Sequence, residues 1–169
     1  MKSVRYWLRR PAKALTRLGR LIRPTPTAVQ FSVIDLGSMA ELERFSFLHP
    51  LVPEPLTGKK FLRDDLGLTG MEVSLHRLPP GFSVPFYHCH KQNEEFYLFL
   101  SGEGDMQVDG QVIPIREGTA IRIAPEGVRT WRNTSAGPML YIVVQARAGT
   151  LRHSDIRDGK AVRRPVAWP

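Results

Sequence analysis

Short stretches in which apolar and polar residues alternate, each closed by a glycine or proline turn, occupy most of residues 71–147. Alternation with a period of two is the pattern of a β-strand that has one buried face. Between two of these stretches, Val108-Asp-Gly-Gln111 predicts a two-residue type I′ hairpin, because Asp-Gly readily adopts the positive φ angles of that turn. Some eight or nine short strands separated by such turns predict an all-β sandwich or barrel.

A chain of 169 residues is long enough to bury the core of one domain. Its 14 glycines and 14 prolines favour many turns over long helices. The apolar runs at residues 96–100 and 139–144 are too short for membrane-spanning helices. Cys89 is the only cysteine, which excludes an internal disulfide. We expect one domain over residues 31–169, with its first strand at residues 31–36.

The net charge of +8 arises in the N-terminal segment. Residues 1–30 contain eight Lys and Arg and no acidic residue. Residues 31–169 contain 16 acidic residues and 16 Lys and Arg, so their net charge is zero. A neutral body argues against nucleic acid as a partner. Residues 1–23 separate apolar from cationic side chains in a helical pattern, which is typical of a membrane-surface helix or an import sequence. We expect a basic amphipathic arm over residues 1–30, either disordered or targeting, and a cytoplasmic protein unless the arm directs it to a membrane surface or an organelle.

Two of the five histidines stand at alternate positions, with a carboxylate shortly after them. His88 and His90 are two residues apart, so on a strand their side chains point to the same side. A tight hairpin would bring Glu95 beside them, whereas Glu94 would lie on the opposite face. Two imidazoles and one carboxylate form a facial ligand set for Fe(II) and related divalent metals. The alternative is that both histidines are ordinary half-buried strand residues.

The spacing of Gly81, His88, His90, Glu95 and Gly102 resembles the first motif of the cupin family, G-x5-H-x-H-x3-4-E-x6-G, with a first gap that is one residue longer. The segment "GTAIRIAPEGVRTWRN" is similar to the second motif, G-x5-P-x-G-x2-H-x3-N. By motif, the resemblance covers roughly residues 70–147. It implies a double-stranded β-helix, or jelly roll, whose inter-sheet cavity holds the site, and commonly a homodimer.

The fourth ligand of the family, the histidine of the second motif, has no counterpart in residues 118–138. The segment is one residue short, so counting from Gly127 places Thr130 at that position and counting back from Asn133 places Arg129 there. An inward Arg129 would oppose a metal, pair with Glu95 or anchor an anionic substrate. An inward Thr130 would leave three protein ligands and more open coordination positions.

The strand that follows the histidines is apolar on both faces. Tyr97 shares the side of the carboxylate ligand and is expected to line the cavity. Phe96, Leu98 and Leu100 make the other face apolar, and a dimer interface would cover it. Cys89 is expected to be a buried residue that points away from the site.

The other histidines receive no ligand role. His76 belongs to an alternating stretch and is expected on its outer face, because the residues that alternate with it are Met71, Val73 and Leu75. His49 and His153 lie in predicted loops.

Two functions therefore compete. The first is a metalloenzyme in which His88, His90 and Glu95 bind Fe, Mn, Ni or Zn, and the family resemblance implies a dioxygenase, decarboxylase or isomerase. The second is a metal-free cupin module that binds a sugar or small acid. In either case Arg129, Thr130 and Tyr97 are the candidate substrate-binding residues, and no catalytic residue is singled out.

Overall fold

The computed structural model describes residues 30–153 and 155–169. The predictions for residues 1–23 lie outside the described residues. The chain divides into two units, Met1–Gly37 and Ser38–Pro169, and the second contains all the named strands. The predicted domain boundary at residue 30 stays a prediction. In the part of the chain that the structure describes, no helix is long and apolar enough to cross a membrane.

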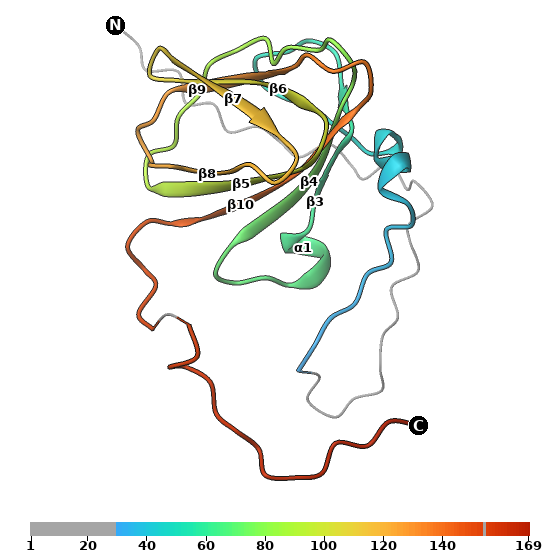
Figure 1. Cartoon of the computed structure of the whole chain (residues 1–169), viewed down its shortest axis with the longest axis vertical. Coiled ribbons are helices and arrows are strands. Elements are labelled where there is room, and N and C mark those ends of the chain that lie inside the picture. Colours follow the sequence, from blue (N-terminus) through green and yellow to red (C-terminus); the bar gives the residue numbers. More distant parts are fainter. Residues whose placement is uncertain (1–29, 154) are drawn as a thin grey trace, which may run out of the picture. The chain divides into compact units, whose positions relative to one another are not determined.

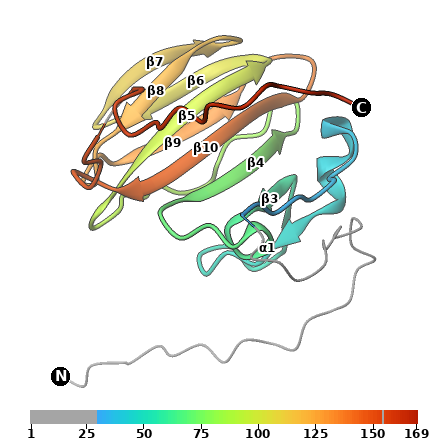
Figure 2. The same ribbon diagram turned by 90° about the horizontal axis from the view of Figure 1, so that it is seen from below.

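The second unit consists mainly of two antiparallel sheets that face each other, as Figures 1 and 2 show. The larger sheet has five strands in the order β3 (Lys59–Phe61), β4 (Glu72–Leu78), β10 (Met139–Arg147), β5 (Asn93–Ser101) and β8 (Ala120–Ile123). The smaller sheet has three strands in the order β7 (Gln111–Arg116), β6 (Glu103–Val108) and β9 (Arg129–Asn133). A short separate pair joins β1 (Ser46–Phe47) and β2 (Leu56–Thr57). The prediction of a mostly β fold is confirmed.

The helices of the described residues are short. They comprise a 3₁₀-helix at Met39–Arg44 and a single turn of α-helix, α1 (Arg63–Leu66). The predicted first strand at residues 31–36 is wrong, because these residues form no continuous strand and the side chain of Phe31 is exposed. Alternation makes a strand only where a partner strand accepts its hydrogen bonds.

The core lies between the two sheets. Inward side chains of both sheets form it, among them Tyr97, Phe99, Met106, Trp131 and Tyr141. Large aromatic side chains suit this position because each buries a large apolar area and the rings pack against each other. Trp131 donates a hydrogen bond from Nε1 to the Tyr141 hydroxyl at 2.8 Å, which satisfies a polar atom inside the core.

The predicted hairpin joins β6 to β7. Asp109 and Gly110 have φ angles of 48° and 82°, as a type I′ turn requires. The turn sets the register in which Val108 pairs with Gln111 and Gly104 with Ile115.

Strand β4 turns the opposite face inward from the one predicted. Ser74, His76 and Leu78 are buried between the sheets, whereas Val73 and Leu75 are half-buried on the outer face. The prediction of an outer-face His76 was therefore wrong. Polarity did not mark the solvent side of this strand, because the inward Ser74 and His76 hydrogen-bond to each other at 2.8 Å and need no water.

Candidate functional site

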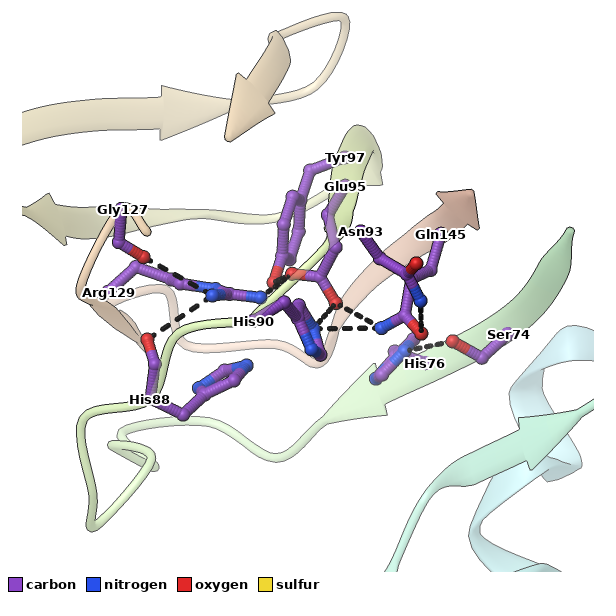
Figure 3. Close-up of polar contacts among 10 residues, drawn as sticks. All are labelled: Ser74, His76, His88, His90, Asn93, Glu95, Tyr97, Gly127, Arg129 and Gln145. Carbon is purple, nitrogen blue, oxygen red and sulfur yellow. Dashed lines mark hydrogen bonds and ion pairs between the residues drawn. The ribbon is translucent and has the colours of Figure 1, made fainter. Parts of the chain in front are cut away.

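The three predicted metal ligands converge at one place (Figure 3). One ligand atom from each of His88, His90 and Glu95 lies within 4.8 Å of the other two. Glu95 is the third residue of β5, and the histidines lie on the extended segment before it. That segment is not a regular strand: His88 forms an isolated bridge with Arg129 on β9, with backbone hydrogen bonds of 3.0 and 3.1 Å. The predicted tight hairpin before Glu95 is wrong, because His88 pairs antiparallel with Arg129 and Glu95 pairs antiparallel with Ile123, so the chain keeps its direction as it crosses from the smaller sheet to the larger one. The bridge fixes the histidines against the smaller sheet, while Glu95 belongs to the larger one.

The carboxylate of Glu95 accepts hydrogen bonds at both oxygens. Oε2 accepts from the Tyr97 hydroxyl at 2.6 Å and from the Arg129 guanidinium. Oε1 lies 2.9 Å from His90 Nε2 and accepts from Gln145 Nε2 at 3.2 Å. Burial by itself would raise the pKa of Glu95, but the Tyr97 hydrogen bond, the Arg129 charge and the His90 contact lower it to about 2. Glu95 is therefore ionised at neutral pH.

Arg129, and not Thr130, is the residue that faces the site. Its side chain is 0% exposed, and Nη1 donates to the backbone carbonyls of His88 at 3.3 Å and Gly127 at 3.2 Å. The Thr130 hydroxyl donates to the Val84 carbonyl at 3.0 Å instead. The position of the family's fourth ligand thus carries a permanent cation that pairs with Glu95.

His88 has the protonation state of a metal ligand. Burial, and next the charge of Arg129, lower its pKa to about 4, so the ring is neutral at neutral pH. Its Nδ1 is buried and has no hydrogen-bond partner among the described residues. A neutral imidazole with an unsatisfied buried nitrogen and an ionised carboxylate fit a divalent metal, whereas the charge of Arg129 opposes one.

Gln145 is a site residue that the sequence reasoning missed. It lies on β10 directly across from Glu95, and its Nε2 is 2.8 Å from His90 Nε2. Its Oε1 accepts from Asn93 Nδ2 at 3.0 Å. The signal was present in the alternation of β10, because Gln145 follows Tyr141 and Val143 on the inward face.

A cavity of about 280 Å³ adjoins the candidate ligands. His88, Glu95 and Tyr97 line one part of it, and most of the remaining wall is apolar or aromatic. The prediction that Tyr97 lines the cavity agrees with this wall. His76 lines it too: its ring stacks on Tyr141 with centroids 4.4 Å apart, and its Nε2 is 2.8 Å from the Ser74 hydroxyl. Burial, and then the charge of Lys59, hold the pKa of His76 well below its usual value.

Two residues from the proline-rich region before β4 also line the cavity. The ring of His49 stacks on Phe86 with centroids 4.1 Å apart. The Lys59 ammonium lies 4.3 Å from the centre of the Phe61 ring and 5.3 Å from that of Phe47. The sequence predicts a loop at His49 and indicates no role for Lys59, because the short strands of this region can be recognised only from their pairing.

The remaining predicted positions lie away from the site. Glu94 is on the outer face of β5, as expected, and pairs with Arg122 at 2.5 Å. Cys89 is exposed, so the prediction of a buried cysteine was wrong. His153 is exposed in the segment after β10.

Comparison with known proteins agrees with the fold and the motifs. Residues 74–145 match the cupin domain family. The solved structure of a cupin protein from Bacteroides fragilis is 38% identical, with a TM-score of 0.60 over 69% of this chain and 97% of that chain. A putative sugar phosphate isomerase from Acidithiobacillus ferrooxidans is 26% identical, with a TM-score of 0.54 over 66% of this chain and 74% of that chain. Among curated proteins, none matches this chain. The motifs, the paired sheets and the match to the Bacteroides protein together place the chain in the cupin superfamily.

Proposed function

We propose that this cupin binds a divalent metal through His88, His90 and Glu95 and acts on a small molecule in the adjoining cavity. The observation that carries this proposal is the convergence of the three ligand atoms within 4.8 Å of one another. Two imidazoles and one carboxylate suit Fe, Mn, Ni or Zn. A bound metal would act as a Lewis acid or activate dioxygen or water.

The surrounding residues hold the ligands in place. The Tyr97 hydroxyl and the Arg129 guanidinium fix one oxygen of Glu95, so the other oxygen faces His90. The Gln145 amide contacts both His90 and Glu95 and orients the two ligands relative to each other. The largely apolar wall of the cavity excludes water from the reacting molecule.

The family implies three reaction types, namely those of a dioxygenase, a decarboxylase and an isomerase. The similar protein from Acidithiobacillus ferrooxidans is described as a putative sugar phosphate isomerase. This description supports isomerisation as one reaction to assay, but it does not carry over the sugar as substrate, because the wall of this cavity is largely apolar.

A metal-free binding module is the second candidate function. The ion pair between Arg129 and Glu95 favours it, because a guanidinium stands where the family places its fourth ligand. In that case the ion pair holds the carboxylate without a metal, and the cavity binds its ligand without catalysis.

Metal content distinguishes the two functions. The untagged protein is reconstituted anaerobically and measured by elemental mass spectrometry beside the variants His88→Ala and Glu95→Gln, with the exposed His153→Ala as control. We expect close to one metal per chain in the wild type and the control, and loss of metal in both site variants. A wild type without metal would contradict the metalloenzyme and support the binding module.

We also propose a homodimer. The outer face of the five-stranded sheet is apolar along two adjacent strands, where β5 contributes Phe96, Leu98 and Leu100 and β10 contributes Leu140, Ile142 and Val144. Phe96 and Leu100 remain 42% and 38% exposed. A second copy of the chain would cover this face. Contact of residues 1–23 with a membrane surface is a further proposal and comes from sequence only.

A further inference from the structure

Lys59 brings a cation into the cavity. It is the first residue of β3 and pairs with His76 of β4, so its side chain lies on the inner face of the sheet. Lys59 and Glu95 line the same cavity from different strands. The two phenyl rings beside the Lys59 ammonium, those of Phe47 and Phe61, stabilise it by cation–π contact.

The described residues offer the Lys59 ammonium no hydrogen bond and no ion pair. Burial lowers the pKa of Lys59 to about 8, although the charges of Glu95 and Glu72 partly offset this effect. The next residue, Lys60, differs because its ammonium pairs with Asp65 at 2.5 Å. A partly buried ammonium without an acceptor is costly, and an anion in the cavity would satisfy it.

Among the described residues of the cavity wall, no carboxylate pairs with this cation. Glu95 is the carboxylate of the wall, and Arg129 already pairs with it. Arg77 pairs with Glu43 at 2.7 Å. The three histidines of the wall, His49, His76 and His88, all have lowered pKa values and are neutral at neutral pH. The cavity therefore has an excess of one positive charge.

The rest of the wall selects an apolar body for the ligand. Phe82, Val84, Phe86, Leu78 and Trp131 line it, together with several prolines. A sugar would bring several hydroxyl groups into this space, and most of them would find no hydrogen-bond partner. A flat or compact apolar group would pack against the rings.

We infer that the cavity binds a small organic monoanion, such as a carboxylate with an aromatic or branched apolar body, whose anionic group lies at Lys59 and whose body extends along the aromatic wall toward His88 and Glu95. This inference rests on the proposed function, because it names the ligand class of the same cavity. Binding of the anion at Lys59 does not require a bound metal. Lys59 acts in it as a binding residue.

Benzoate and its neutral analogue benzamide test the inference. Both are titrated by calorimetry into chelator-treated protein, which removes direct binding of the carboxylate to a metal. We expect the wild type to bind benzoate at least about tenfold more tightly than benzamide, as a charge-assisted hydrogen bond would give. Lys59→Met should lose this preference, Lys59→Arg should retain it, and Lys60→Met, which removes the adjacent charge outside the cavity, should behave like the wild type.

The result that overturns the inference is equal binding of benzoate and benzamide by the wild type, or no binding of benzoate at millimolar concentration. Tighter binding of glucose 6-phosphate than of benzoate would contradict the inference that the ligand has an apolar body. Lys59→Met removes a cation that lacks an acceptor, so its melting temperature without ligand should equal or exceed that of the wild type, which separates lost binding from lost folding. Metal content is measured on protein from the same preparations before the chelator is added. A wild type that prefers benzoate but holds no metal contradicts only the metal proposal. A wild type that holds metal but does not prefer benzoate contradicts only the inferred anion site.

Discussion

Glu95 illustrates how a buried charge is maintained in this fold. Its polar partners come from four places in the sequence, with Tyr97 on the same strand, His90 before it, and Arg129 and Gln145 on two other strands. Removing one partner of a buried ion pair costs about 3–5 kcal/mol, because the other charge stays buried and uncompensated. Loss of the Glu95 charge would leave the Arg129 guanidinium buried and uncompensated. His88→Ala is therefore the site variant that disturbs folding least in the metal experiment.

His76 is expected to make the protein sensitive to mild acid. Its pKa is held well below 6.5 by burial, whereas the pKa of an unfolded histidine is near 6.5. Between pH 7 and pH 5 the unfolded chain therefore binds a proton that the folded chain does not, and the free energy of unfolding falls as the pH falls. The largest slope for one histidine is about 1.4 kcal/mol per pH unit. Urea denaturation at several pH values between 5 and 7 measures this slope.

The variant His76→Gln can still hydrogen-bond Ser74 but cannot bind the proton, so its slope should be smaller than that of the wild type. Some slope should remain, because His88 is shifted in the same direction. Glu95 contributes little in this range, since its pKa lies below the range in both states. His153→Gln, at an exposed position, should match the wild type. Identical slopes for the wild type and His76→Gln would contradict a neutral, buried His76.

At the scale of elements, the three-stranded sheet depends on one close approach between strands. Gly104 of β6 pairs with Asn133 of β9, and a Cβ atom added at Gly104 would lie 1.9 Å from the carbonyl oxygen of Arg132. Neither backbone can move away without breaking the ladder that carries Arg129 on β9. Gly104→Ala should therefore lower the free energy of unfolding by about 3 kcal/mol or prevent folding. Urea denaturation followed by circular dichroism measures the change.

Gly137 provides the matched control for this substitution. A Cβ atom there would meet no heavy atom within 4 Å, and its φ angle is not positive. Gly137→Ala should change the free energy of unfolding by no more than about 0.5 kcal/mol. If the two alanine variants were equally stable, the close approach of β6 and β9 would not be a constraint on the fold.

At the scale of the whole molecule, the proposed dimer predicts that charge on the outer face of the larger sheet separates the copies. Phe96 and Leu100 of β5 are partly exposed, so lysine at both positions should leave the folded chain intact and bury charge only in the dimer. Size-exclusion chromatography with light scattering should give twice the mass of the chain for the wild type and the mass of one chain for Phe96→Lys with Leu100→Lys.

Val112 on β7 supplies the control for the dimer experiment, because it is 61% exposed on the smaller sheet. Val112→Lys should keep the mass of the wild type. A wild type with the mass of a single chain, or a double variant that remains a dimer, would mean that this face is not the interface.

The sequence by itself determined the features that depend on neighbouring residues. His88 and His90 share a side because they are two residues apart, and an extended chain turns alternate side chains to one side. The turn at Asp109 and Gly110 follows from the φ angles that these two residue types accept. Backbone geometry fixes each of these over fewer than about ten residues, so no distant partner was needed to predict them.

Only the tertiary structure decided which distant side chains join the site. Arg129 faces Glu95, and Thr130 does not, because of the register of β9 against β6 and against the segment that carries His88. Gln145 and Lys59 enter the site through pairings with strands that lie far from them in the sequence. A strand turns over completely when its register shifts by one residue, so alternation gives the two faces of a strand without saying which one is inside. That choice depends on which side chains the opposing sheet can accommodate, and this is a property of the folded chain.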